Sequence, residues 1–324
     1  MRAVVVESTG GPEVLTVQEL EQPQPGPGEL RVDVSAAGVN FIDVYHRTGA
    51  YTLPLPIRLG SEGAGTVSAV GEGVDDVSVG DRVAWAMVQG AGYAEQVLVP
   101  AARAVPVPDG IDDLEVAAAV MLQGMTAHYL CESTYPARSG ETALVHAAAG
   151  GLGLLLTQML AAKGVRVIGT TSTEEKELLA RGAGAAEVVR YTEQDLRTEV
   201  ERLTDGRGVD VVYDSVGKDT FDAGLDVLRP RGYLVLCGAS SGPVPPFDPQ
   251  TLNPKGSLFL TRPTLGHYIA TREELLERGG AVLSAVAEGR LDVRIGGRYP
   301  LDEAGRAHDD LQGRRTTGKL LLVP

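Results

Sequence analysis

The chain has 324 residues, 43% hydrophobic and 22% charged, which is typical of a soluble globular protein large enough for two domains. Its net charge of −14 provides no basic surface for nucleic acid or for an anionic membrane. No apolar run approaches the roughly 18 residues of a membrane helix, and the apolar start is too short for a signal peptide. Cys131 and Cys237 lie in apolar surroundings typical of reduced thiols. We therefore expect a cytoplasmic protein.

The first part of the chain, up to about residue 123, predicts a compact, barrel-like β domain. Short apolar runs are separated by glycine turns, and the Pro-Gly-rich stretch 23–28 must be an irregular connection. A helix over 112–130 follows, broken near Gly124. The expected strands cover 3–6, 29–34, 65–70, 82–86 and 94–100.

The middle of the chain alternates strands with helices, which predicts an α/β, doubly wound parallel sheet. Polar turns follow the strands, and the carboxyl ends of strands are where such sheets bind ligands. The expected strands are 141–145, 165–170, 187–189, 209–214 and 233–237, and the expected helices are 154–164, 173–181 and 192–204.

Beyond residue 261 the pattern changes again. A helix is expected over 272–288, and the closing apolar run 319–323 predicts a strand without a partner in the alternating pattern. We expect this strand to return to the first domain. The predicted domains are thus residues 1–123 with 262–324, and residues 124–261.

A glycine-rich turn at residues 146–153 lies between a predicted strand and a predicted helix, the context of a dinucleotide-binding fingerprint. Gly150 and Gly153 hold the second and third glycine positions, and Ala148 holds the first. In such a turn, backbone N–H groups approach a pyrophosphate and the helix N-terminus adds partial positive charge. The expected cofactor contacts in the turn are Ala149, Gly150, Gly151, Leu152 and Gly153.

Several further segments resemble one known superfamily. Residues 38–43, 211–217, 260–265 and 314–318, together with the Ala-Ala-Gly-Gly-x-Gly turn, are similar to the medium-chain dehydrogenase/reductases, and within them to the zinc-independent, zeta-crystallin-like quinone oxidoreductases. The resemblance extends from Val4 to Pro324. It implies a GroES-like catalytic domain built from both chain ends, a Rossmann domain in the middle, and usually a homodimer.

The resemblance also bears on zinc. Asn40 and Ser61 stand where zinc-dependent members carry Cys and His ligands, and the stretch 85–93 contains no cysteine lobe. Tetrahedral zinc needs three or four converging ligands, whereas the five histidines are scattered. We expect no metal, and we interpret Glu62 as a structural hydrogen-bonding carboxylate.

The end of the second Rossmann strand indicates the kind of nicotinamide cofactor. NAD sites usually place an acid there for the ribose hydroxyl, but this chain has Thr170 and Thr171. Glu174 and Glu175 are expected to face outward, so that they do not repel a 2′-phosphate. The residues expected to reach this phosphate are Ser172, Lys176 and, by the resemblance, Tyr191, and Thr171 is expected to contact the cofactor as well. NADPH is therefore expected in preference to NADH.

The resemblance places Asn40, Tyr45 and Tyr51 around the nicotinamide, together with Thr126. The Asn40 amide and the Tyr51 phenol would polarise a quinone carbonyl as it gains a hydride. In the alternative interpretation, the tyrosines only line the pocket. The remaining family cofactor contacts are Ser215, Gly238, Ser240, Thr261, Arg262 and Arg314.

These features predict an NADPH-dependent, zinc-free quinone reductase whose partner is a small-molecule quinone. An enoyl or enone reductase, which reduces an activated C=C bond from a very similar site, is one alternative. A non-catalytic, RNA-binding role known among zeta-crystallin relatives is another, and the charge of −14 argues against it.

Overall fold

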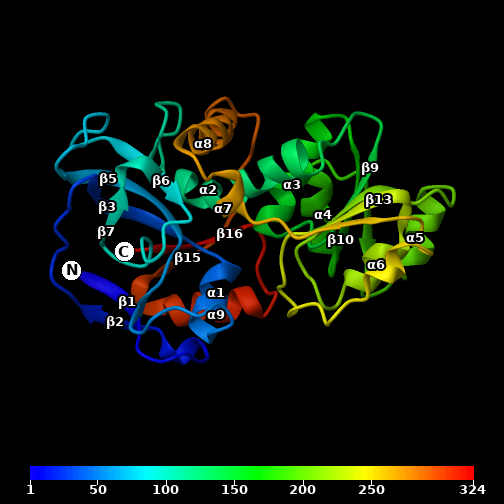
Figure 1. The fold of residues 1–324 in the computed structure, drawn as a ribbon, viewed down its shortest axis with the longest axis horizontal. Helices are drawn as coiled ribbons and strands as arrows, with labels where there is room; N and C mark the ends of the chain where they lie inside the picture. The colour runs from blue at the N-terminus through cyan, green and yellow to red at the C-terminus, as the bar shows by residue number, and fades with distance from the viewer. The chain divides into compact units, whose positions relative to one another are not determined.

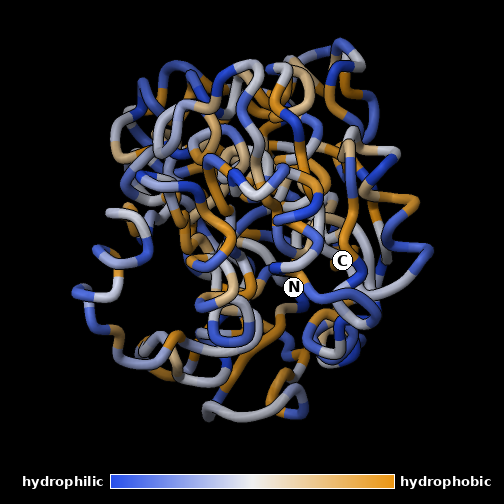
Figure 2. Tube along the Cα trace, turned by 90° about the vertical axis from the view of Figure 1, so that its right-hand side faces the viewer, coloured by the Kyte–Doolittle hydropathy of each residue, from blue (hydrophilic) through white to orange (hydrophobic).

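The computed structural model describes residues 1–324 and divides the chain into two compact units. Unit 1 consists of Met1–Met125 and Tyr268–Pro324, and unit 2 of Thr126–His267. Figure 1 shows the fold of each unit as a ribbon, and in Figure 2 the outward-facing turns are mostly hydrophilic. None of the helices combines the length and the apolar character needed to cross a membrane.

Unit 1 is built around a seven-stranded sheet in the order β15-β16-β3-β5-β6-β8, with β7 also paired to β3. A smaller sheet has the order β2-β1-β4. The strands are β1 (Arg2–Val6), β2 (Thr16–Glu19), β3 (Glu29–Val39), β4 (Ile57–Arg58), β5 (Glu62–Val70), β6 (Arg82–Ala86), β7 (Gln96–Pro100), β8 (Val105–Pro106), β15 (Ile295–Pro300) and β16 (Lys319–Val323).

The closing strand β16 pairs antiparallel with β3, with Leu320 opposite Val39. This confirms that residues 319–323 return to the first domain. Alternating residues of β3, such as Leu30 and Val32, are fully buried and pack in a core that also contains Trp85. The predicted β-rich first domain is therefore confirmed.

Helix α2 (Leu114–Tyr129) differs from the prediction, because it runs unbroken through Gly124. A Cβ at Gly124 would lie 2.6 Å from Cγ1 of Val282 on α8 (Arg272–Ala287). The glycine is thus needed for close helix packing, and it does not break the helix. The other helices of this unit are α1 (Phe41–Thr48) and α9 (Ala304–Gln312), neither of which was predicted, and α7 (Leu265–Tyr268) lies at the unit boundary.

Unit 2 is a six-stranded parallel sheet in the order β11-β10-β9-β12-β13-β14. This is the Rossmann order 3-2-1-4-5-6, so the predicted doubly wound sheet is confirmed, and β9 and β12 flank the point where the strand order reverses. The strands are β9 (Thr142–Val145), β10 (Arg166–Thr171), β11 (Glu187–Arg190), β12 (Val209–Asp214), β13 (Leu228–Leu236) and β14 (Phe259–Thr261).

Helices cover both faces of this sheet, with α3 beside α4 and α5 beside α6 (Figure 1). Their bounds are α3 (Gly151–Ala162), α4 (Glu174–Gly182), α5 (Leu196–Leu203) and α6 (Phe221–Asp226). Helix α5 begins later than the predicted residue 192, because the Asp195 side chain caps it by accepting a 2.9 Å hydrogen bond from the N–H of Thr198. Short 3₁₀ or π turns cover Pro12–Val14, Ala101–Arg103, Leu130–Thr134, Pro249–Leu252 and Leu301–Glu303.

Candidate active site

The three residues expected to act on the substrate lie in or beside helix α1. Asn40 precedes the helix, and its N–H donates to Oδ2 of Asp43 at 3.0 Å, which fixes the first turn. Tyr45 lies on the helix, and Tyr51 follows it, with its N–H bonded to the Tyr45 carbonyl at 3.0 Å. The two tyrosine rings are 5.2 Å apart, and Tyr51 is 46% exposed. The structure therefore brings Asn40, Tyr45 and Tyr51 together around one short helix.

The carboxamide of Asn40 is held by two buried charged side chains. Its Nδ2 donates to Oε1 of Glu62 at 2.7 Å, and its Oδ1 accepts from Nζ of Lys319 at 2.7 Å. Lys319 also forms an ion pair with Glu62, and the second carboxylate oxygen of Glu62 accepts from the N–H of Leu122 at 2.6 Å. Glu62 is thus a structural hydrogen-bonding carboxylate, as predicted, whereas Lys319 was not foreseen.

Gly38 makes room for this cluster. A Cβ at this position would lie 2.5 Å from Cε of Lys319 and would overlap Oε1 of Glu62. Both charged side chains are therefore packed directly against the backbone of β3, two residues before Asn40.

Asp43 is the centre of a second buried network. Its carboxylate accepts from Oγ of Ser61 at 3.0 Å and from the hydroxyl of Tyr93 at 3.2 Å, in addition to the Asn40 N–H. Burial raises the pKa of Asp43 to about 7, and the hydrogen bonds from Ser61 and Asn40 offset part of that effect. The residue at the position of a zinc-binding histidine, Ser61, is thus engaged with Asp43.

The network continues from Tyr93 to α9. The guanidinium of Arg47 lies 3.2 Å from Nδ1 of His308, and the Tyr93 hydroxyl lies 3.0 Å from Nε2 of the same ring. Arginine can only donate, so Nδ1 accepts and Nε2 carries the proton, which goes to the Tyr93 oxygen. Burial and the neighbouring Arg47 lower the pKa of His308 to about 3, so this ring is neutral. Hydrogen bonds therefore run in one direction, from Arg47 to Asp43.

In unit 2, the glycine-rich turn lies at the carboxyl end of β9 and opens α3, which begins at Gly151. The turn contains a non-glycine residue with positive φ, Ala147 at 52°. Ala148, at the first fingerprint position, fits because Gly169 on β10 leaves space: a Cβ at Gly169 would lie 2.8 Å from the Ala148 Cβ. A Cβ at Gly153 would overlap the Ala147 carbonyl oxygen, so this position requires glycine.

Most of the other expected cofactor residues gather at the same edge of the sheet. Parallel strands end together, and Thr171, Tyr191, Ser215, Gly238, Ser240, Thr261 and Arg262 lie at or just after the carboxyl ends of β10 to β14. Asp214, fully buried, accepts from the N–H groups of Val216 and Gly217 at 2.8 and 3.0 Å and so shapes the turn that holds Ser215. A Cβ at Gly238 would overlap the Ser215 carbonyl.

The end of β10 carries polar groups suited to a phosphate. The Oγ1 of Thr171 is buried without a hydrogen-bond partner. Ser172 follows, Thr173 caps α4, and Lys176 lies in its first turn. Tyr191 is 48% exposed just beyond β11. Glu174 and Glu175 are exposed, as expected.

Two predicted site residues lie elsewhere in the chain. Thr126 is on α2 at the start of unit 2. Arg314 belongs to unit 1, on an exposed turn after α9, with a positive φ of 56°. One buried residue of the dinucleotide turn was not predicted to matter: Nδ1 of His146 lies 3.1 Å from Oγ1 of Thr170, and burial lowers the pKa of this histidine.

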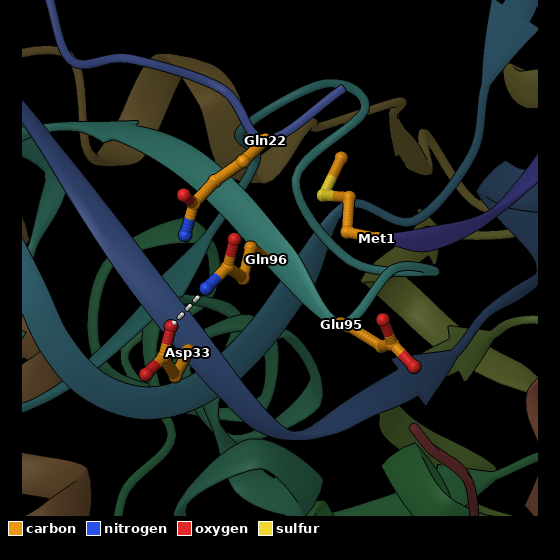
Figure 3. A pocket seen from close by; sticks show the side chains of 5 residues that line it. All are labelled: Met1, Gln22, Asp33, Glu95 and Gln96. Atoms are coloured by element: carbon orange, nitrogen blue, oxygen red, sulfur yellow. Dashed lines mark hydrogen bonds between the residues drawn. The ribbon is translucent and has the colours of Figure 1, made fainter. Parts of the chain in front are cut away.

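A shallow surface pocket of about 430 Å³ lies in unit 1 and is lined by Met1, Gln22, Asp33, Glu95 and Gln96, none of which is a predicted site residue (Figure 3). Three of its polar side chains are already hydrogen-bonded: Gln96 donates to Asp33 at 2.8 Å, and Glu95 accepts from Arg2. It therefore contributes no candidate chemistry. No three His, Cys, Asp or Glu side chains are grouped so as to hold a metal ion.

A β-rich unit assembled from both ends of the chain and a Rossmann unit with a glycine-rich turn define the class of medium-chain dehydrogenase/reductases. Comparison with known families agrees. Residues 26–109 match the family described as "Alcohol dehydrogenase GroES-like domain", and residues 151–278 match "Zinc-binding dehydrogenase".

Individual relatives narrow the class. The chain is 49% identical to a quinone oxidoreductase of Pseudomonas aeruginosa over 97% of each chain, and 42% identical to a 2-haloacrylate reductase of a Burkholderia species over 99% of this chain and 98% of the relative. The crystal structure of Escherichia coli quinone oxidoreductase complexed with NADPH is 42% identical, covers 100% of both chains, and superposes with a TM-score of 0.96. The chain belongs to the quinone oxidoreductase family.

Proposed function

We propose that this protein is an NADPH-dependent quinone reductase that works without zinc. The observation that carries the proposal is the near-full-length similarity to quinone oxidoreductases, one of them solved with NADPH, in a chain whose own dinucleotide turn has the required geometry. The overall reaction consumes one NADPH, one quinone and one proton, and yields NADP⁺ and a hydroquinone.

Unit 2 would hold the cofactor. The backbone N–H groups at the start of α3 suit a pyrophosphate, because the first turn of a helix leaves such donors unpaired. The partnerless Oγ1 of Thr171, with Ser172, Lys176 and Tyr191, suits a 2′-phosphate, and no acid stands there to favour a ribose hydroxyl. NADPH, when bound, supplies the hydride.

Unit 1 would act on the acceptor. Tyr51, half exposed, offers a hydroxyl that would donate a hydrogen bond to a quinone carbonyl as negative charge develops on its oxygen. Asn40 already donates one N–H to Glu62, and its second N–H has only a weak contact, 3.4 Å from the Gly38 carbonyl. This second N–H is the one that would serve an acceptor. Tyr45 would support the ring of Tyr51.

The residues at the zinc-ligand positions do not suit the metal that the name of the second matched family implies. Asn40 is bound between Glu62 and Lys319, and Ser61 donates to Asp43. A metal ion there would also have to displace the positive charge of Lys319. We therefore propose that carbonyl polarisation comes from hydrogen-bond donors of the protein.

A second candidate reaction is reduction of an activated C=C bond. The 42% identity to a 2-haloacrylate reductase over 99% of this chain favours it as an additional activity. Both reactions place hydride on an electron-poor carbon framework and need a donor on the carbonyl oxygen, so the same residues would serve both.

We also propose a cytoplasmic homodimer that binds no nucleic acid. β14 forms the outer edge of the unit 2 sheet, and Phe259 on it is 48% exposed while stacked on Tyr233 at 4.4 Å. An unpaired strand edge with an exposed aromatic side chain is suited to pairing with a second copy. The two free cysteines support a reducing compartment, and the net charge of −14 offers no basic surface for RNA.

The direct test is NADPH consumption with a panel of quinones and enones, comparing the unmodified protein with Tyr51→Phe. The variant keeps the ring and loses the hydroxyl, so we expect kcat to fall roughly tenfold, below the ~10²–10³ commonly lost with one oxyanion donor, because a quinone is intrinsically electrophilic. A deuterium isotope effect from labelled NADPH must show that hydride transfer limits the rate. An unchanged kcat under that condition would mean that Tyr51 only shapes the pocket.

A further inference from the structure

Glu62 and Lys319 form a buried ion pair that the proposed reaction does not use directly. Both residues are almost completely buried, with exposed fractions of 0% and 2%. Removing two charges from water is costly, and replacing such a pair by apolar residues is often neutral or stabilising. Stability alone therefore gives no reason for placing this pair beside Asn40.

The ion pair determines which way the Asn40 carboxamide points. Lysine can only donate and an ionised glutamate can only accept, so Oδ1 must face Lys319 and Nδ2 must face Glu62. A reversed amide would set a donor against the ammonium group and an acceptor against the carboxylate. The amide is thus locked in one orientation by partners of opposite sign.

The backbone holds Lys319 in a fixed position next to Asn40. Lys319 is the first residue of β16, its N–H donates to the Arg294 carbonyl at 2.8 Å, and the next residue, Leu320, pairs with Val39 beside Asn40. Gly38 leaves the space through which the lysine side chain passes. The ammonium group is therefore fixed by strand register, and it does not depend on a flexible loop.

We propose that Lys319 and Glu62 are positioning residues: they hold the Asn40 carboxamide so that its second N–H is presented to the substrate oxygen. This inference rests on the proposed function of Asn40. In this arrangement the ammonium group of Lys319 is a permanent cation next to Oδ1 of Asn40, and the carboxylate of Glu62 balances its charge. Neither residue needs to touch the substrate.

Two variants separate positioning from simple structural support. Lys319→Met removes the charge but keeps an unbranched side chain, and it leaves Glu62 buried without a counter-ion. The double variant Lys319→Met/Glu62→Gln removes both charges. The glutamine side chain introduced at position 62 would accept from the Leu122 N–H and donate to Oδ1 of Asn40, which satisfies the hydrogen bonds only with the Asn40 amide reversed.

We expect Lys319→Met to lower both the melting temperature and kcat, the latter by about tenfold to a hundredfold, with the NADPH dissociation constant unchanged. The double variant should recover much of the melting temperature, because no unpaired charge is left buried, but it should not recover kcat. As a matched control, Lys163→Met breaks an exposed ion pair with Glu132, 2.7 Å in length, and should leave kcat at the level of the unmodified protein.

Nuclear magnetic resonance of the asparagine side chains reports the amide orientation without any turnover. The chain has only two asparagines, Asn40 and the exposed Asn253, so isotope-labelled asparagine gives two pairs of N–H signals that are simple to assign. We expect one Asn40 N–H signal to show the shift of a hydrogen bond to a carboxylate, and this signal to change in both variants. Asn253 serves as the internal control.

Each outcome decides between positioning of the Asn40 amide and simple structural support. If Lys319→Met keeps the kcat of the unmodified protein, or if the double variant regains kcat together with the melting temperature, the positioning role is wrong. If the unmodified protein reduces no quinone or enone, the proposed function fails, and the Asn40 signals then decide alone. Unchanged signals in Lys319→Met would overturn the inference, and changed signals would support it.

Discussion

The contact between Ala148 and Gly169 provides a quantitative test of how the dinucleotide turn fits its sheet. Gly169→Ala would place a new Cβ 2.8 Å from the Ala148 Cβ, whereas carbon atoms in contact prefer about 3.5–4.0 Å. Neither methyl group can rotate away, because each is attached directly to the backbone. Overpacking of this kind costs about 1–3 kcal/mol.

The reciprocal change has a different cost. Ala148→Gly removes a fully buried methyl group, worth about 0.8 kcal/mol, and adds about 0.5–1 kcal/mol of backbone entropy in the unfolded chain. In the double variant Ala148→Gly/Gly169→Ala the clash disappears and the space left by Ala148 is filled. We therefore expect the double variant to be no less stable than Ala148→Gly, with a coupling free energy of about 1–3 kcal/mol.

Urea unfolding of the four proteins measures this coupling, and fluorescence titration with NADPH shows whether the turn keeps its shape. We expect Gly169→Ala to weaken NADPH binding and the double variant to restore it. If the two substitutions are additive within about 0.5 kcal/mol, the two positions are not in contact and our account of the turn is wrong.

Three further predictions follow from the two units. Lys176→Ala should weaken NADPH binding and leave NADH binding unchanged; equal effects on both cofactors would exclude a contact with the 2′-phosphate. The pKa of Asp43 is raised from 3.8 to about 7 in the folded protein. The contribution of its protonated form to the free energy of unfolding is therefore complete below the unfolded-state pKa, and it is lost as the pH rises through the folded-state pKa. Asp43→Asn should therefore reduce the loss of stability between about pH 4 and pH 7, by about 1.4 kcal/mol per unit of pKa shift. Unfolding measured as a function of pH tests this, and an unaltered slope of stability against pH would contradict the raised pKa of Asp43. Phe259→Lys should shift the mass measured by light scattering toward the monomer if β14 forms the dimer interface, and an unchanged mass would exclude this edge.

The sequence predicts local features of this protein well. The strand, glycine turn and helix around residues 141–164 are contiguous, so their pattern was readable without tertiary information. The break predicted at Gly124 was wrong for the opposite reason: the neighbour that requires glycine there, Val282, lies far along the chain. Helix α1 was not predicted because eight residues are too few to establish a periodic pattern, although the acid three residues after Asn40 was a usable signal.

Long-range partners explain most of what the sequence did not show about the candidate site. The resemblance identifies Asn40 as a donor, but its binding by Glu62 and Lys319 depends on the pairing of β16 with β3. The hydrogen-bond chain from Arg47 through His308 to Tyr93 likewise joins three distant segments. In a single sequence these residues look like ordinary surface charges or packing residues.

The distance in sequence between Asn40 and Lys319 has a consequence for protein synthesis. The two residues are 279 positions apart, and at about 5–20 residues per second a ribosome needs about 14–56 seconds to add the lysine after the asparagine. During this interval unit 2, which is one continuous segment, is completed, while β3 lacks its neighbour β16 and Glu62 lacks its counter-ion. The nascent chain therefore completes unit 2 before the cluster of Asn40, Glu62 and Lys319 can form. Premature termination just before residue 319 would give a complete unit 2 and a unit 1 that lacks this cluster.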